Sequence, residues 1–113
     1  MLNSLTALDA LFQALSESSR RSILQRLSKG TATVSELARP LAMSLAAVVQ
    51  HVQKLEACGL VTTTKHGRVR RCALNTQALQ QAENWLSERR LQWESRLDRL
   101  GVPLDDAQSN PHT

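Results

Sequence analysis

The sequence is poor in several residue types, and each shortage excludes a class of protein. Only 3% of its 113 residues are aromatic, and there are four glycines and three prolines. A leucine-rich chain with so few helix breakers suits one mainly helical domain with a single modest core. No apolar run approaches the roughly 18 residues of a membrane span, and no signal peptide is visible. We therefore expect a cytoplasmic protein without a membrane partner.

Groups that would support catalysis or metal chemistry are also scarce. The three histidines, His51, His66 and His112, have no carboxylate or nucleophile pattern around them, and no glycine-rich phosphate-binding loop is present. The two cysteines, Cys58 and Cys72, are expected to be free thiols in a reducing compartment. We therefore predict neither an enzyme nor a cofactor nor a metal site.

Positive charge is present in small excess, and it is concentrated in one part of the chain. The formal net charge is +4. Residues 44–75 carry five cations and one anion, whereas residues 76–100 carry four of each. An excess of cations confined to one segment is typical of a surface that attracts nucleic-acid phosphates.

Two segments ahead of residue 30 have apolar residues at helical spacing. The pattern predicts a first helix over about 3–15 and a second over about 18–29, ending at Gly30. Three arginines of the second helix are expected on its outer face, where they would mainly serve solubility: Arg20, Arg21 and Arg26.

The middle of the chain has the signals of two helices joined by a tight turn. Thr33 and Glu36 have the spacing of a capping box, and Pro40 discourages the helix they open from continuing. Ser44 is a suitable N-cap for the next helix, which has one apolar stripe and ends at Gly59. This arrangement predicts a helix-turn-helix, whose second helix enters the DNA major groove.

Two β-prone runs follow at once and predict a hairpin with a basic tip. The turn is expected at His66-Gly67, which would place Val61 opposite Cys72. A polar-faced helix followed by a basic hairpin is the recognition helix and wing of a winged helix-turn-helix. The predicted fold is therefore mainly α with a small β-hairpin.

The last predicted helix runs to about residue 100 and contains both tryptophans. Because a small domain offers little surface to cover its apolar stripe, we expect a homodimer built from the two ends of residues 1–100. Residues 101–113 are polar and are expected to form a disordered tail. The predicted dimer contacts are Leu5, Leu8, Leu11, Trp85, Trp93, Leu97 and Leu100.

Four stretches resemble the ArsR family of bacterial transcriptional repressors. They are ALSESSRRSILQRL (14–27), TVSELA (33–38), MSLAAVVQHVQKLEACGLV (43–61) and HGRVRRCALN (66–75). The resemblance covers about residues 8–100. It implies a homodimeric winged helix that binds a palindromic operator in double-stranded DNA and represses its own operon.

The sequence looks closest to the metal-independent branch of the family, whose last helix has the pattern seen here as NWLSERRLQWESRLDRL. The metalloid sensors of the family carry a Cys-x-Cys motif where this chain has Val34, Ser35 and Glu36. Its zinc and cobalt sensors use Asp and His pairs on the last helix, and residues 76–100 contain no histidine.

The expected DNA contacts fall on the recognition helix and on the wing. Gln50 is the best candidate for reading a base, since its amide can both donate to and accept from adenine. His51 reaches phosphate or a base, or instead braces the wing. The full set is Ser44, Ala46, Ala47, Val49, Gln50, His51 and Lys54 on the helix, with Lys65, His66, Arg68 and Arg70 on the wing.

Two alternatives remain open from the sequence. Cys58 and Cys72 are either packing residues or a redox- or metalloid-responsive thiol switch, in which Arg70 and Arg71 would stabilise a thiolate at Cys72. The fold could also serve as a protein–protein adaptor, in which case the basic wing would be incidental.

Overall fold

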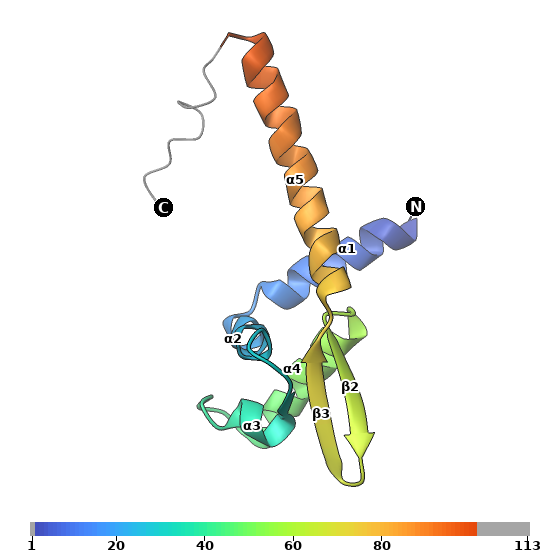
Figure 1. The fold of residues 1–113 in the computed structure, drawn as a ribbon, viewed down its shortest axis with the longest axis vertical. Coiled ribbons are helices and arrows are strands. Elements are labelled where there is room, and N and C mark those ends of the chain that lie inside the picture. Colours follow the sequence, from blue (N-terminus) through green and yellow to red (C-terminus); the bar gives the residue numbers. More distant parts are fainter. Residues whose placement is uncertain (1, 102–113) are drawn as a thin grey trace. The chain divides into compact units, whose positions relative to one another are not determined.

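The computed structural model describes residues 2–101, with side chains from Thr6 onward, as a mainly helical chain with a small sheet (Figure 1). The first and second helices begin and end within two residues of the predicted positions, the last helix ends at Arg99, close to its predicted end, and the predicted fold class is confirmed. The elements in order are α1 (Leu2–Leu15), α2 (Ser18–Leu27), β1 (Ala32–Thr33), α3 (Val34–Ala38), α4 (Leu45–Ala57), β2 (Val61–His66), β3 (Val69–Leu74) and α5 (Thr76–Arg99).

The chain forms two compact units, Met1–Ala82 and Glu83–Thr113. The first unit contains every element up to the start of α5, and the described part of the second consists of the remainder of α5. Of the tail predicted at 101–113, all but Gly101 lies outside the described residues. None of the helices within residues 2–101 has the length and apolar character needed to cross a membrane.

The core of the first unit is formed by the apolar stripes that the sequence predicts. Leu11 of α1, Ile23 of α2 and Leu37 of α3 are buried together with Val48 and Leu55 of α4. Leu11 is only 1% exposed in the single chain. Its assignment to the dimer interface is therefore wrong, because this side chain is already covered by its own core.

The predicted caps fix where the two helices of the helix-turn-helix begin. Thr33 Oγ1 accepts from the Glu36 N–H at 3.2 Å, and Glu36 Oε1 accepts from the Thr33 N–H at 2.8 Å. This backbone hydrogen bond lowers the pKa of the Glu36 carboxyl from its ordinary value. Ser44 Oγ accepts from the Ala47 N–H at 3.1 Å and so starts α4. The capping box and the Ser44 cap are both confirmed.

The hairpin turn lies one residue later than predicted. Gly67 and Arg68 form the turn, and Gly67 has a φ of +64°. A two-residue turn with a positive φ only at its first central position is of type II′, in which glycine comes first. Cys72 therefore pairs with Thr63, and the predicted pairing of Cys72 with Val61 is wrong.

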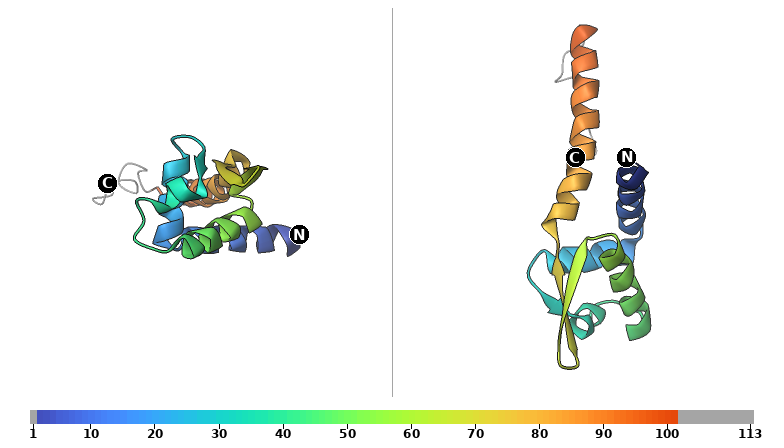
Figure 2. Two further views of the ribbon diagram at one scale, coloured as in Figure 1. Left: turned by 90° about the horizontal axis from the view of Figure 1, so that it is seen from below. Right: turned by 90° about the vertical axis from the view of Figure 1, so that its right-hand side faces the viewer.

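The sheet has a third strand that the sequence did not predict. Its order is β1-β3-β2, and the two residues of β1 pair antiparallel with Cys72 and Arg71 of β3. A two-residue strand has no detectable alternation, so it arises only through this pairing. β3 is thereby the central strand, and the wing is tied to the residues that open α3. The two views in Figure 2 show the hairpin beside α3 and α4, and α4 packs against α3 and β2.

Candidate nucleic-acid interface

Helix α4 has one buried face and one exposed face along its whole length. Val48, Val52 and Leu55 are buried in the core. Because successive residues of a helix are rotated by about 100°, Gln50 and Gln53 fall on the opposite side, and both are exposed. The predicted base reader Gln50 is therefore available to a ligand, as the prediction requires.

A groove of about 590 Å³ lies between α4 and the hairpin. We call it the helix–wing groove. Its basic wall comes from Lys65 of β2 with Arg68 and Arg70 of the turn and β3, three of the four predicted wing contacts. The lining residues are Thr33, Val34, Ser35, Leu45, Val49, Val52, Gln53, Lys65, Arg68, Val69 and Arg70. One surface thus combines amide, apolar and cationic groups, which is the mixture that reads and holds DNA.

Seven of the eleven groove residues were not among the predicted contacts: Thr33, Val34, Ser35, Leu45, Val52, Gln53 and Val69. Leu45 and Val69 are large apolar side chains that remain about half exposed, and Gln53 lies beside them. Leu45 lies four residues before Val49, and Gln53 lies four residues after it, so all three share one side of the helix. That spacing from an already predicted contact was the signal that could have found Leu45 and Gln53, whereas Val69 belongs to β3.

None of the other predicted contacts lines this groove, and these include Ala47, Gln50 and His51. Ser44 is committed to capping α4, and Ala46 is exposed on its outer face. His66 is exposed at the end of β2, where it pairs with Val69. Lys54 faces a separate cavity next to α1 and is not part of the groove lining.

His51 is braced from α2 and not from the wing. Arg20 Nη1 lies 3.3 Å from His51 Nδ1. Since a guanidinium has only donors, Nδ1 must be the acceptor, and in neutral His51 the ring proton is then on Nε2. His51 is thus held ready to donate from Nε2, which suits a phosphate oxygen or a base acceptor.

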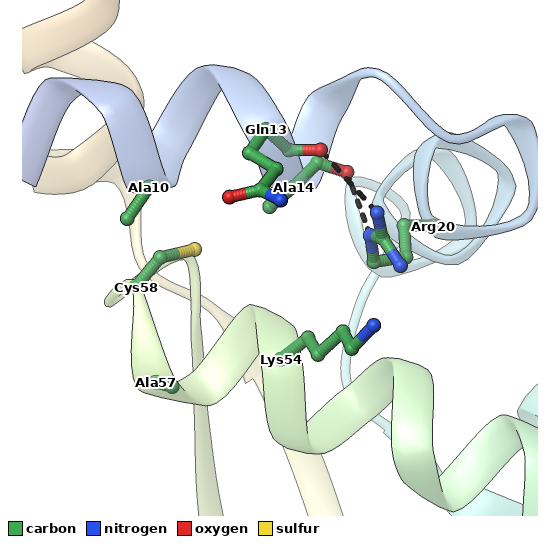
Figure 3. Close-up of a pocket in the computed structure, with 7 residues that line it drawn as sticks. All are labelled: Ala10, Gln13, Ala14, Arg20, Lys54, Ala57 and Cys58. Atoms are coloured by element: carbon green, nitrogen blue, oxygen red, sulfur yellow. Dashed lines mark hydrogen bonds between the residues drawn. The ribbon is translucent and has the colours of Figure 1, made fainter.

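The three arginines predicted to serve solubility have structural partners. Arg20 is only 7% exposed, and its Nε and Nη2 donate to the carbonyls of Ala14 at 2.8 Å and Gln13 at 3.3 Å (Figure 3). Arg21 Nη1 donates to the Leu15 carbonyl at 2.8 Å. These carbonyls belong to the last turn of α1, where no intrahelical donor remains. Arg26 Nη1 likewise donates to the Gly30 carbonyl at 3.2 Å.

The two cysteines have different surroundings. Cys72 is 0% exposed, and burial raises the pKa of its thiol, while the charge of Arg70 offsets only part of that effect. Arg70 therefore stabilises the Cys72 thiolate as predicted, but burial outweighs this effect and favours the thiol. Cys58 is partly exposed, and its Sγ donates to the Leu55 carbonyl at 3.3 Å. These observations favour packing roles for both thiols.

Within residues 2–101 no three His, Cys, Asp or Glu side chains gather as metal ligands would.

The residues predicted for the dimer interface differ in exposure. Trp93 and Leu100 are 56% and 70% exposed, whereas Leu97 is buried in the single chain. Leu8 is partly buried, and the side chain of Leu5 lies outside the described residues.

Comparison with known proteins agrees with this geometry. A helix-turn-helix domain model matches residues 15–64. The HTH-type transcriptional regulator Rv2034 of Mycobacterium tuberculosis is 45% identical over 53 residues, which cover 47% of this chain and half the length of Rv2034. The transcriptional repressor SdpR of Bacillus subtilis is 29% identical over 76 residues, covering 67% of this chain and 84% of SdpR. The crystal structure of the ArsR family transcriptional regulator RHA00566 superposes with a TM-score of 0.75 at 45% identity, covering 78% of this chain and 97% of that one.

Proposed function

The chain belongs to the ArsR family of winged helix-turn-helix transcriptional regulators, and on that premise we propose that it is a repressor that binds a palindromic operator as a homodimer. In this proposal the operator controls the repressor's own gene. The observation that carries it is the helix–wing groove, in which the outer side of α4 meets the basic residues of the hairpin.

Helix α4 and the wing have different tasks in the complex. α4 enters the major groove, where Gln50 reads a base and Ala46, Ala47 and Val49 lie against thymine methyl groups. The wing cations contact phosphates, which adds affinity without much sequence information. His51, oriented by Arg20, donates from Nε2 to a phosphate or base acceptor.

The homodimer is proposed from the exposed apolar residues of α5. Leu86, Trp93 and Leu100 follow at intervals of seven residues and are all more than half exposed. Such a stripe on a helix is typical of a seam with another helix. In a dimer bound to a palindrome, the two α4 helices would then lie about one turn of DNA apart, roughly 34 Å.

We further assign the chain to the metal-independent branch of the family. Zinc needs three or four nitrogen, sulfur or oxygen ligands at close range, and the family's metal-binding positions hold other residues here. Equilibrium dialysis is expected to find no zinc, cobalt or arsenite bound stoichiometrically. One tightly held metal ion per chain would contradict this assignment.

A gel shift with the DNA upstream of the chain's own gene tests the proposal against the adaptor alternative. A repressor should shift this fragment in the presence of excess unrelated competitor DNA and should protect one palindrome from cleavage. An adaptor would bind all fragments equally weakly. Equal competition by unrelated DNA would contradict sequence-specific repression.

A further inference from the structure

A second cavity, of about 270 Å³, lies between α1 and the recognition helix α4 (Figure 3). We call it the α1–α4 cavity. It is separate from the helix–wing groove, with which it shares no lining residue. The residues that line it are Ala10, Gln13, Ala14, Arg20, Lys54, Ala57 and Cys58.

One end of this cavity is cationic. Figure 3 shows the Lys54 ammonium pointing toward the Arg20 end. Arg20 uses three of its five N–H groups on Ala14, Gln13 and His51, which leaves two that can bind an anion. Among residues 2–101, no hydrogen bond or ion pair is recorded for the Lys54 ammonium.

The carboxylate of Glu17, which lies beside Arg20, is already engaged. Glu17 caps α2, where its Oε1 accepts from the Arg20 backbone N–H at 3.0 Å. That hydrogen bond lowers the pKa of Glu17, which keeps it ionised beside Arg20 and His51. Glu17 therefore balances part of the Arg20 charge and leaves the Lys54 charge unpaired, so the cavity has room for one further negative charge.

The other end of the cavity is small and mostly apolar. It is formed by Ala10 of α1, Ala57 of α4 and the C-cap residue Cys58, while the Gln13 amide extends into the space between the two helices (Figure 3). The volume lies just below the roughly 300–1,000 Å³ of pockets for drug-sized ligands. The fitting ligand is therefore smaller than a drug and has one charged and one apolar end.

From this arrangement we propose that the α1–α4 cavity is a binding site for a small organic carboxylate. The carboxylate group binds between Lys54 Nζ and the free N–H groups of Arg20, with the Gln13 amide as a further donor. The apolar part of the ligand lies against Ala10 and Ala57.

A ligand in the α1–α4 cavity would act on the DNA-reading surface, because the two share helix α4. Lys54 and His51 both belong to α4, and Arg20 contacts the cavity and His51 at once. A bound carboxylate draws Lys54 away from DNA phosphate and adds a negative charge beside the recognition helix. If the proposed repressor function holds, the ligand and the operator therefore weaken each other's binding by the same factor.

Isothermal titration of the DNA-free full-length protein tests the site independently of that function. The probes are benzoate, its neutral isostere benzamide, and inorganic phosphate. We expect one benzoate per chain, with benzamide and phosphate binding at least tenfold more weakly. Lys54→Gln should weaken benzoate about tenfold or more, the loss expected for one charge-assisted hydrogen bond. The control Lys65→Gln makes the same charge change on the wing and should leave benzoate binding unchanged.

A second variant probes the apolar end. Ala57 is exposed, so Ala57→Leu should fold normally by circular dichroism while filling the space for the ring. Its benzoate affinity should fall at least tenfold. Three results would overturn the proposal: no benzoate binding to the wild type, equal binding of phosphate, or equal losses in Lys54→Gln and Lys65→Gln. If benzoate binds as expected but leaves operator affinity unchanged, the site stands and its link to the repressor function is refuted.

Discussion

Arg20 connects three parts of the first unit through one side chain. It donates to two carbonyls at the end of α1, belongs to α2, and holds His51 on α4. An arginine in the outer stripe of a helical wheel is expected in solvent, but the donors of Arg20 bind carbonyls in the last turn of α1, of which the Gln13 carbonyl also accepts from Ser16. The contact with His51 makes it a positioning residue for the DNA-reading helix.

Replacing this arginine should cost stability. Arg20→Met keeps much of the side-chain volume but removes the Nε donor of the Ala14 carbonyl, whereas the Gln13 carbonyl keeps the N–H and Oγ of Ser16 as donors. We expect a loss of about 1.5–3 kcal/mol in the free energy of unfolding, measured by urea denaturation. Arg21→Met is the matched control, because it removes one exposed bond to the Leu15 carbonyl and should cost less than about 1 kcal/mol. Equal small losses of unfolding free energy in the two variants would show that Arg20 contributes little to stability.

The two thiols should react at different rates. The pKa of Cys72 is raised by burial, so less thiolate is present at neutral pH, and the side chain is also out of reach. A disulfide-forming reagent should label about one thiol per native chain and the second only on unfolding. In Cys58→Ala the fast phase should disappear. Two equally fast phases in the wild type would contradict the packing interpretation for Cys72.

Substitutions on the helix should change the sequence specificity of DNA binding, whereas substitutions on the wing should change its overall affinity. Gln50→Ala should cost about 1–3 kcal/mol at the preferred site and relax specificity at one base position, since a bidentate contact is lost. Gln25→Ala, on the exposed face of α2, is the control.

Arg68→Ala should weaken binding to all DNA sequences alike and lower the salt dependence by about one ion per chain. Anisotropy titrations with matched and mutated duplexes measure both effects.

The sequence predicts the elements better than the contacts between them. Helix caps and apolar stripes are local, so Ser44, Thr33 and Glu36 were placed correctly. The predicted position of the wing turn was wrong because glycine fits either central position of a two-residue turn. Only the pairing of β2 with β3 decides between the two positions. For the same reason β1 was missed. The α1–α4 cavity was not foreseen, because its residues come from three helices and their approach leaves no pattern in the sequence.

Binding to a palindromic operator depends on a second copy of the chain. Leu86→Glu with Trp93→Glu should give a monomer in sedimentation experiments at micromolar concentration, because charges then face the proposed seam. Ser95→Glu places a charge on the same helix away from that stripe and should leave the dimer intact. A wild-type protein that is monomeric at this concentration would contradict the proposed assembly.

The salt dependence of binding to a palindromic duplex from the chain's own upstream region tests directly whether the helix and the wing bind an operator. We predict two chains per duplex and an affinity far above that for a scrambled duplex. The affinity should fall steeply with salt, with a logarithmic slope of roughly −7 if the four predicted cations of each chain, Lys54, Lys65, Arg68 and Arg70, all contact phosphate. Equal affinity for the scrambled duplex, together with a slope near zero, would show that the helix–wing groove does not read DNA.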